Sequence, residues 1–234
     1  MKNILITGAS RGIGFELTNQ FLNLGYSVIA TCRNPKNALN LEKKRYENPN
    51  ELEILCMDVE SEESIKLCFS SLFKRNKKID ILYNNAGIID WNDLNNVDAS
   101  AIQKIYKVNL TGALLVTRYS IPCLTLSDSP LIINLSSRLG SIELRGETQL
   151  GGAIAYQCSK AALNMLTRQS AIDLLNQNIR VISQSPGWVK TDMGGEGAKY
   201  ETSESVSKMI DSLEKLNIDQ SGIFIGEDGQ TIPW

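Results

Sequence analysis

Residues 7–14 read TGASRGIG, three glycines in eight positions. The aliphatic run ILI at residues 4–6 precedes them, and apolar residues at helical spacing (Ile13, Leu17, Phe21) follow. Glycines after a strand let the backbone turn tightly and approach a phosphate at the positive end of the next helix. The stretch therefore predicts a strand, turn and helix that hold a pyrophosphate, with a plain glycine turn as the alternative.

Short aliphatic and β-branched runs alternate with helical patterns along the chain. Strands are expected at 2–6, 26–31, 52–57, 79–83, 131–135, 179–184 and 222–225, and helices between them, notably at 12–24, 61–75, 99–119 and 154–176. Repeated strand and helix units predict a parallel sheet with both faces covered. We expect an α/β fold of the doubly wound Rossmann type, with seven parallel strands and ligands at their carboxyl ends.

Composition narrows the classes of function. At 234 residues, the chain is expected to form one dinucleotide-binding and catalytic domain over 1–234. A formal charge of -2 without a long basic run argues against nucleic acid or an anionic membrane as partner. Without a signal-peptide core or 18 successive apolar residues, the protein is expected to be cytoplasmic. Its five cysteines show no CxxC spacing, so no metal site is expected.

Further motifs follow in a fixed order. They are NNAG at 84–87, KVNLTG around Asn109, the serine pair Ser136 and Ser137, YQCSK at 156–160 and PGWVKTDM at 186–193. Together with TGxxxGIG they resemble the short-chain dehydrogenase/reductase family over nearly the whole chain. The GSI after the serines, PGWVKTDMGG and the tail ending in Trp are most similar to carbonyl reductases of the sniffer and C-factor type.

The chain has no histidine, so another residue type must act as acid or base. Tyr156 and Lys160 are four positions apart and project from one face of a helix. A neighbouring ammonium and a cationic nicotinamide lower a tyrosine pKa, which predicts Tyr156 as the proton donor in carbonyl reduction; a solvated helix face is the alternative. We expect Ser137 to hold the substrate oxygen, with Ser136 left open, and the resemblance makes Asn109 the fourth catalytic residue, fixing a water beside Lys160.

The end of the second strand predicts the cofactor. Cys32 stands where an NAD-preferring enzyme needs a carboxylate for the ribose hydroxyls, and Arg33 follows. Arg33 and Arg11 are expected to bind the 2′-phosphate of NADP(H), because a planar guanidinium matches phosphate; two surface arginines are the alternative. The resemblance adds contacts from Gly8, Ser10, Gly12, Ile13, Gly14, Asp58, Val59, Asn85, Ala86, Gly87, Tyr156, Lys160, Pro186, Gly187, Val189, Thr191 and Met193, with Asp58 on the adenine.

Two stretches are expected to border the active site. Residues 138–152 are interpreted as a loop insertion, because Ser137 lies 19 positions before Tyr156 instead of the usual 13 or so. Residues 188–216 are interpreted as a substrate lid: a glycine-rich segment that closes when NADPH binds, then a helical stretch whose apolar side covers the substrate. A permanently ordered connection is the alternative.

The expected function is NADPH-dependent reduction of a small carbonyl compound (aldehyde, ketone or quinone) to the alcohol. A 3-oxoacyl-carrier-protein reductase or hydroxysteroid dehydrogenase is the alternative within the family. An NADP(H)-binding signalling or sensor protein of C-factor type is the alternative from another class, and the presence of all four catalytic residues argues against it. A homodimer or homotetramer stays open.

Overall fold

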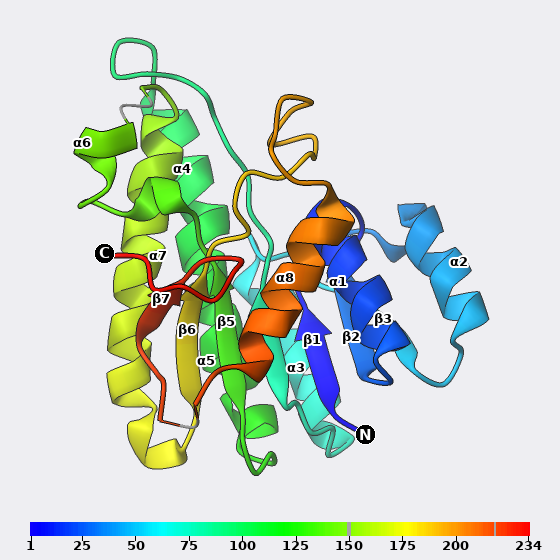
Figure 1. Cartoon of the computed structure of the whole chain (residues 1–234). Helices are drawn as coiled ribbons and strands as arrows, with labels where there is room; N and C mark the ends of the chain where they lie inside the picture. Colours follow the sequence, from blue (N-terminus) through cyan, green and yellow to red (C-terminus); the bar gives the residue numbers. More distant parts are fainter. Residues whose placement is uncertain (149–150, 218) are drawn as a thin grey trace.

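The computed structural model describes residues 1–148, 151–217 and 219–234. It contains a seven-stranded sheet in the order β3-β2-β1-β4-β5-β6-β7, with every neighbouring pair parallel. The strands are β1 (Asn3–Ile6), β2 (Ser27–Cys32), β3 (Leu52–Cys56), β4 (Ile81–Asn84), β5 (Leu131–Leu135), β6 (Arg180–Gln184) and β7 (Ile223–Ile225). The doubly wound Rossmann fold expected from the sequence is confirmed (Figure 1).

The helices connect these strands across both faces of the sheet. They are α1 (Gly12–Asn23), α2 (Leu39–Glu47), α3 (Glu62–Lys74), α4 (Ala99–Tyr106), α5 (Ala113–Leu124), α6 (Arg145–Thr148), α7 (Ile154–Asp173) and α8 (Thr202–Glu214). Short 3-10 turns occupy Pro35–Asn37, Arg138–Gly140 and Leu175–Gln177, and a π-helical segment occupies Lys107–Gly112.

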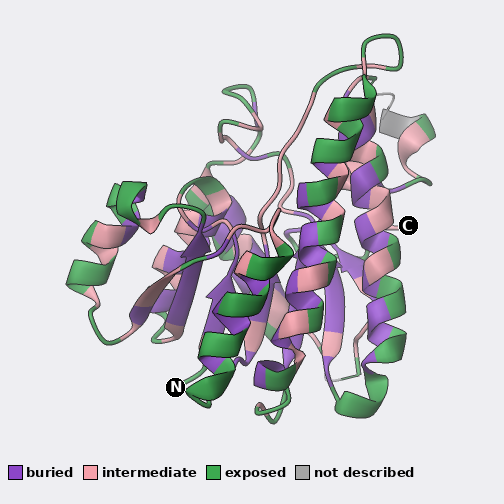
Figure 2. Ribbon diagram, turned by 180° about the vertical axis from the view of Figure 1, so that it is seen from behind, coloured by how far each residue is buried: buried purple, intermediate pink, exposed green. Residues whose placement is uncertain are grey.

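Each face of the sheet has its own hydrophobic core. Successive side chains of a strand point to opposite faces of the sheet. Ile4 and Ile6 therefore pack with α1, α2 and α8 on one face, whereas Leu5 packs with α3, α5 and α7 on the other. Figure 2 shows the result, with buried strands enclosed by helices whose outer sides are exposed. Because both faces are covered, the strands are mostly apolar, and ligands reach the sheet only at its ends.

The structure corrects three details of the expected elements. The helix expected over 99–119 is three segments, α4, the π-helical segment and α5, and it continues to Leu124. The loop expected over 138–152 contains the 3-10 turn Arg138–Gly140 and α6, and its residues 149 and 150 lie outside the described part of the chain. Helix α2 was not located from the sequence, because its mostly charged residues leave only Leu41 buried.

Helix α8 belongs to the core. Val206, Met209 and Ile210 are buried on the same face of the sheet as α1, and α8 lies beside α1 in Figure 1. The apolar side of this helix packs against the sheet because a strong helical stripe of aliphatic side chains is most stable there. That side is therefore not available to cover a substrate, and the lid stays a prediction for residues 188–201 only.

The role of α8 in the core predicts a stability effect. Met209→Ala should lower the free energy of unfolding by about 2–4 kcal/mol, because it opens a cavity beneath the helix. Ile172→Ala on the exposed side of α7 is the matched control and should cost less than about 0.5 kcal/mol. Urea unfolding followed by circular dichroism measures both, and equal small losses would contradict the packing of α8.

Candidate active site

The glycine turn after β1 is closed against the end of β4. Gly8 has a φ of +65°, and a Cβ there would lie 3.0 Å from the Cα of Ala86. A Cβ on Gly14 would lie 2.5 Å from the carbonyl oxygen of Gly8. The hydroxyl of Thr7 accepts hydrogen bonds from the backbone N–H groups of Asn85 and Ala86, each at 3.0 Å. Glycine is therefore required at both positions, and the TGxxxGIG and NNAG motifs form one unit.

This turn fits a phosphate. Helix α1 begins at Gly12, whose φ is +54°, and its N-cap residue Arg11 makes no side-chain cap hydrogen bond. The first backbone N–H groups of the helix are thus open to an anion, at the positive end of the helix dipole. The side chain of Thr191 reaches the same turn, since a Cβ on Gly12 would lie 3.6 Å from its Cγ2.

Two arginines border the turn, each with a carboxylate beside it. Arg11 lies 3.5 Å from Asp192, and Arg33, which follows β2, lies 3.7 Å from Glu60. Both guanidinium groups are mostly exposed, and ion pairs of this length with an exposed partner are weak. Asp192 is 88% exposed, whereas Glu60 is 24% exposed. The side chains are therefore free to exchange a carboxylate for a phosphate. The carboxylate of Asp58 accepts the backbone N–H of Glu60 at 3.0 Å.

The other residues expected to bind the cofactor lie at the same edge of the sheet. Ser10 and Ile13 belong to the glycine turn and α1, Asp58 and Val59 follow β3, Asn85, Ala86 and Gly87 follow β4, and Pro186, Gly187, Val189, Thr191 and Met193 follow β6. Their exact contacts with a cofactor stay predictions. Position 187 requires glycine, because its φ is +74° and a Cβ would lie 2.9 Å from the ring of Tyr200.

The π-helical segment positions Asn109. The amide oxygen of Asn109 accepts the backbone N–H of Ile88 at 2.9 Å, and its amide nitrogen donates to the carbonyl of Ile88 at 2.9 Å and to the hydroxyl of Ser159 at 3.0 Å. Widening of a helix at one turn is common at functional sites, because it redirects a side chain. Asn109 thereby joins the segment after β4 to helix α7, which carries Tyr156 and Lys160.

Tyr156, Lys160 and Ser137 are brought together, with Tyr156 and Lys160 buried and Ser137 half-buried. The hydroxyl of Ser137 is near enough to the phenol of Tyr156 to lower its pKa, and the Nζ atom of Lys160 lies 5.6 Å from the centre of the Tyr156 ring. Lys160 donates to the carbonyl of Leu135 at 2.6 Å. Ser136 instead donates to the amide oxygen of Asn164 at 2.6 Å and is turned into the protein. Of the two candidate serines, the geometry favours Ser137.

Burial controls the acid–base properties of this group. Desolvation raises the pKa of Tyr156 to about 12, although its hydrogen bond with Ser137 acts in the opposite direction. Desolvation lowers the pKa of Lys160 to about 8. The lowered pKa predicted from the sequence requires the cationic nicotinamide beside Tyr156 and stays a prediction; in the chain alone, removal from water outweighs the neighbours of Tyr156. The chain by itself thus keeps Tyr156 protonated, as a proton donor must be.

The loop over 188–201 is well connected. Val189 and Tyr200 form a bridge between its two arms, and the indole N–H of Trp188 donates to the carbonyl of Gly194 at 2.8 Å. A Cβ on Gly194 would collide with the carbonyl oxygen of Val189, so this glycine serves a tight turn, whereas Gly195 has nothing within 4 Å. These contacts agree with the ordered connection that the sequence left as the alternative to a lid.

Sequence reasoning missed several partners at this edge. Ile88, Ser159 and Leu135 contribute hydrogen bonds that no motif assigns, although Ser159 stands inside YQCSK. It also missed the ion pair between Arg138 and Glu227, whose nitrogen and oxygen lie 3.5 Å apart. Two groups distant in sequence meet there, so only the fold reveals the pair.

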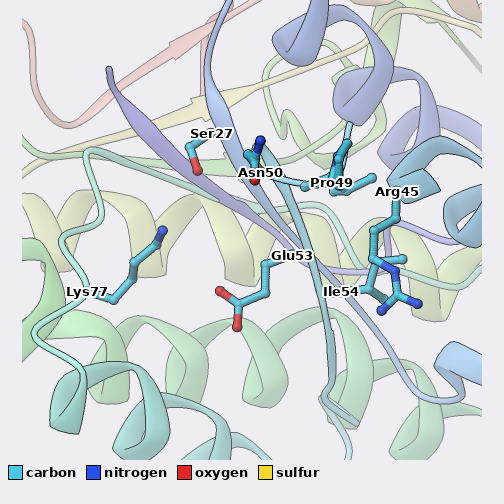
Figure 3. A pocket seen from close by; sticks show the side chains of 8 residues that line it. Ser27, Arg45, Pro49, Asn50, Glu53, Ile54 and Lys77 are labelled. Atoms are coloured by element: carbon cyan, nitrogen blue, oxygen red, sulfur yellow. The ribbon is translucent and has the colours of Figure 1, made fainter. Parts of the chain in front are cut away.

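A cavity of about 450 Å³ lies elsewhere, beside β2 and the edge strand β3. Ser27, Arg45, Asn50, Glu53 and Lys77 are among its lining residues (Figure 3). Ser27 begins β2 and Asn50 precedes β3, so the cavity borders the amino ends of these strands. It is therefore separate from the site at the carboxyl ends.

The described residues form no cluster of three or more metal-binding side chains, and none of their helices is long and apolar enough to cross a membrane.

Comparison with known proteins identifies the family. A model of the short chain dehydrogenase family matches residues 2–201. The chain belongs to this family. Among solved structures it is similar to the NADPH-bound carbonyl reductase from chicken fatty liver, with a TM-score of 0.95 and 35% identity over 100% of this chain and 99% of that one.

Two further relatives bear on the subgroup. The carbonyl reductase Sniffer of D. melanogaster has a TM-score of 0.93 and 31% identity over 100% of both chains. The C-signal of Myxococcus xanthus is 36% identical over 157 residues, which is 67% of this chain and 93% of that protein. The predicted family and its sniffer-like subgroup are confirmed, and the protein is an oxidoreductase of the short-chain type.

The buried lysine predicts a pH effect on stability. Lys160 has a pKa of about 8 in the folded chain against 10.5 when exposed, so between these values the unfolded state binds more protons and stability rises with pH. The free energy of unfolding of the wild type, minus that of Lys160→Met, should therefore rise by about 3 kcal/mol across this window. Chemical unfolding at several pH values measures it, with Lys66→Met on α3 as control, and a flat difference would contradict the burial argument.

Proposed function

We propose that the protein reduces a small carbonyl compound to its alcohol with NADPH. The observation that carries the proposal is the buried phenol of Tyr156, which has Ser137 next to it and the Nζ atom of Lys160 at 5.6 Å from its ring centre. The similar solved structures support it, since they include a carbonyl reductase with bound NADPH and a short-chain dehydrogenase/reductase from Burkholderia multivorans with bound NADP. L-xylulose reductase of Caenorhabditis elegans, 33% identical, is a further carbonyl-reducing relative.

A reduced nicotinamide supplies the hydride when it is bound, and the chain supplies the rest. The hydroxyl of Ser137 donates a hydrogen bond to the substrate oxygen as negative charge develops there. Tyr156 donates its phenolic proton to that oxygen. The cationic ammonium of Lys160 stabilises the phenolate that remains. Open N–H groups at the start of α1 hold the pyrophosphate, and Arg33 and Arg11 bind the 2′-phosphate.

Gly87 leaves room for the water that would return a proton to Tyr156 through Lys160. A Cβ on Gly87 would lie 3.5 Å from the amide oxygen of Asn109 and 3.7 Å from the Nζ of Lys160. Because glycine lacks that atom, a water near this point is within reach of both groups. Both amide N–H groups of Asn109 already have partners, so the water would donate to its oxygen.

The C-signal likeness keeps a signalling role as the second candidate. A signalling protein needs a nucleotide site but not a buried proton donor, so turnover separates the two candidates. Within the family, a 3-oxoacyl-carrier-protein reductase or hydroxysteroid dehydrogenase would use the same four residues, and only a substrate series distinguishes them.

Removing the proton donor tests the proposal. The wild type should oxidise NADPH with at least one member of a panel of aldehydes, quinones, ketosteroids and acyl thioesters. Tyr156→Phe keeps the ring but not the hydroxyl, so turnover should fall about 100-fold or more while the NADPH dissociation constant changes little. Tyr106→Phe on α4 is the control. Activity of Tyr156→Phe within threefold of the wild type would refute the mechanism.

Cofactor preference depends on Arg33 in this proposal. Arg33→Gln should weaken the binding of NADPH by about 1–3 kcal/mol, because charge-assisted contacts are lost, and should leave the binding of NADH almost unchanged. Arg45→Gln is the matched control, since Arg45 also lies in an exposed arginine–carboxylate pair, on α2. Fluorescence titration of both cofactors measures the difference; an equal loss for NADH would show that Arg33 is only structural.

A further inference from the structure

Arg138 and Glu227 have no part in the mechanism above. Arg138 directly follows Ser137 at the carboxyl end of β5, and Glu227 lies just after the end of β7. Strand β6 lies between β5 and β7 in the sheet. Their ion pair, 3.5 Å between Nη2 and Oε2, therefore crosses the carboxyl end of β6, where Pro186 and Gly187 begin the next loop.

The two partners differ in burial. The side chain of Glu227 is 7% exposed and that of Arg138 is 43% exposed. Glu227 is enclosed by close neighbours: a Cβ on Gly187 would lie 3.0 Å from its Cδ atom. A Cβ on Gly226 would lie 2.6 Å from Nη2 of Arg138. The carboxylate is thus fixed in the protein, and it holds one end of a guanidinium whose other side faces solvent.

Most donors of this guanidinium remain available. A guanidinium has five N–H groups in a planar fork. Within the described part of the chain, that of Arg138 makes one hydrogen bond, the long one to Glu227. A second cation is nearby: Lys199 lies over the ring of Tyr200 at 4.6 Å, and that ring packs against Gly187. A second carboxylate is also nearby, since the point 2.6 Å from Nη2 of Arg138 where a Gly226 Cβ would lie is 2.7 Å from Oδ1 of Asp228. The two cations therefore share the carboxyl ends of β5 to β7 with two carboxylates, of which Glu227 is the buried one.

We infer that Arg138 is a specificity-determining residue that binds a carboxylate carried by the carbonyl substrate. The inference rests on the proposed function. Arg138 directly follows Ser137, the residue proposed to hold the substrate oxygen, so its backbone lies at the same carboxyl end of β5. A guanidinium fork binds a carboxylate with two parallel hydrogen bonds, and the buried Glu227 fixes the orientation of that fork. An uncharged substrate would gain nothing from a half-exposed cation held at this position.

The test uses two aldehydes that differ in charge, 4-carboxybenzaldehyde and its methyl ester. The measured quantity is the ratio of kcat/KM for the acid to kcat/KM for the ester. Arg138→Gln should lower this ratio about tenfold or more, and Arg138→Lys should lower it less, because Lys keeps the charge but not the fork. Glu227→Gln should raise the ratio by about threefold, since it removes the competing carboxylate while keeping its shape.

Matched controls come from the opposite edge of the sheet. Arg75 ends α3 and pairs with Glu53 at 2.8 Å, and its side chain is also about half exposed. Arg75→Gln and Glu53→Gln repeat the two charge changes far from Ser137, so neither should move the ratio. They separate a local contact from an effect of net charge.

Equilibrium binding separates failure of this inference from failure of the proposed function. Calorimetry with NADP⁺ and the two alcohol products, 4-(hydroxymethyl)benzoate and its methyl ester, gives the same comparison without turnover. Suppose that the wild type turns over neither aldehyde but binds the carboxylate product more tightly than the ester, and that Arg138→Gln removes this preference. That result would reject the proposed reductase activity and support the contact between Arg138 and the carboxylate. An unchanged ratio in Arg138→Gln and Arg138→Lys, in turnover or in binding, would overturn the role of Arg138.

Discussion

The site depends on the close approach between the turn after β1 and the segment after β4. Gly8 and Gly14 leave no space for a side chain, and the hydroxyl of Thr7 binds two backbone N–H groups across the gap. This contact fixes the start of α1 relative to the residues that lead to Ile88. Because Ile88 in turn holds Asn109, and Asn109 contacts α7 through Ser159, the position of the nucleotide turn is transmitted to the helix that carries Tyr156.

Burial gives this assembly its chemistry and also a cost. An exposed tyrosine and lysine would keep ordinary pKa values, but at this site desolvation raises that of Tyr156 to about 12 and lowers that of Lys160 to about 8. Little water screens the neutral phenol and the lysine beside it. A charged group that binds next to this pair therefore changes the pKa values of both residues strongly. Burying a lysine that donates its hydrogen bond to a carbonyl oxygen, that of Leu135, destabilises the fold at pH values where the lysine is charged.

The fold could be predicted from the sequence, because strand and helix patterns alternate and the parallel sheet needs mostly apolar strands, such as the run LII at residues 131–133. Site residues inside short motifs were readable for a related reason: their spacing places them at one edge of the sheet. Properties that depend on packing could not be predicted from the sequence. The burial that raises the pKa of Tyr156 in the chain alone, the π-helical segment around Asn109 and the assignment of α8 to the core all depend on neighbours distant in sequence. An amphipathic pattern such as that of α8 fits a lid and a core helix equally well.

Arginine–carboxylate pairs recur around this edge, and burial of the carboxylate distinguishes their roles. The partner of Arg11, Asp192, has a side chain that is 88% exposed, so water stabilises it when the arginine leaves for a phosphate. Glu227 is 7% exposed and would be left as an uncompensated buried charge if Arg138 moved away. The exposed partner of Arg11 thus suits an arginine that must turn toward a ligand, while Glu60, the partner of Arg33, is intermediate at 24% exposed. The buried pair suits an arginine that keeps its place and receives the ligand on its open side, which is the requirement for discriminating between substrates beside Ser137.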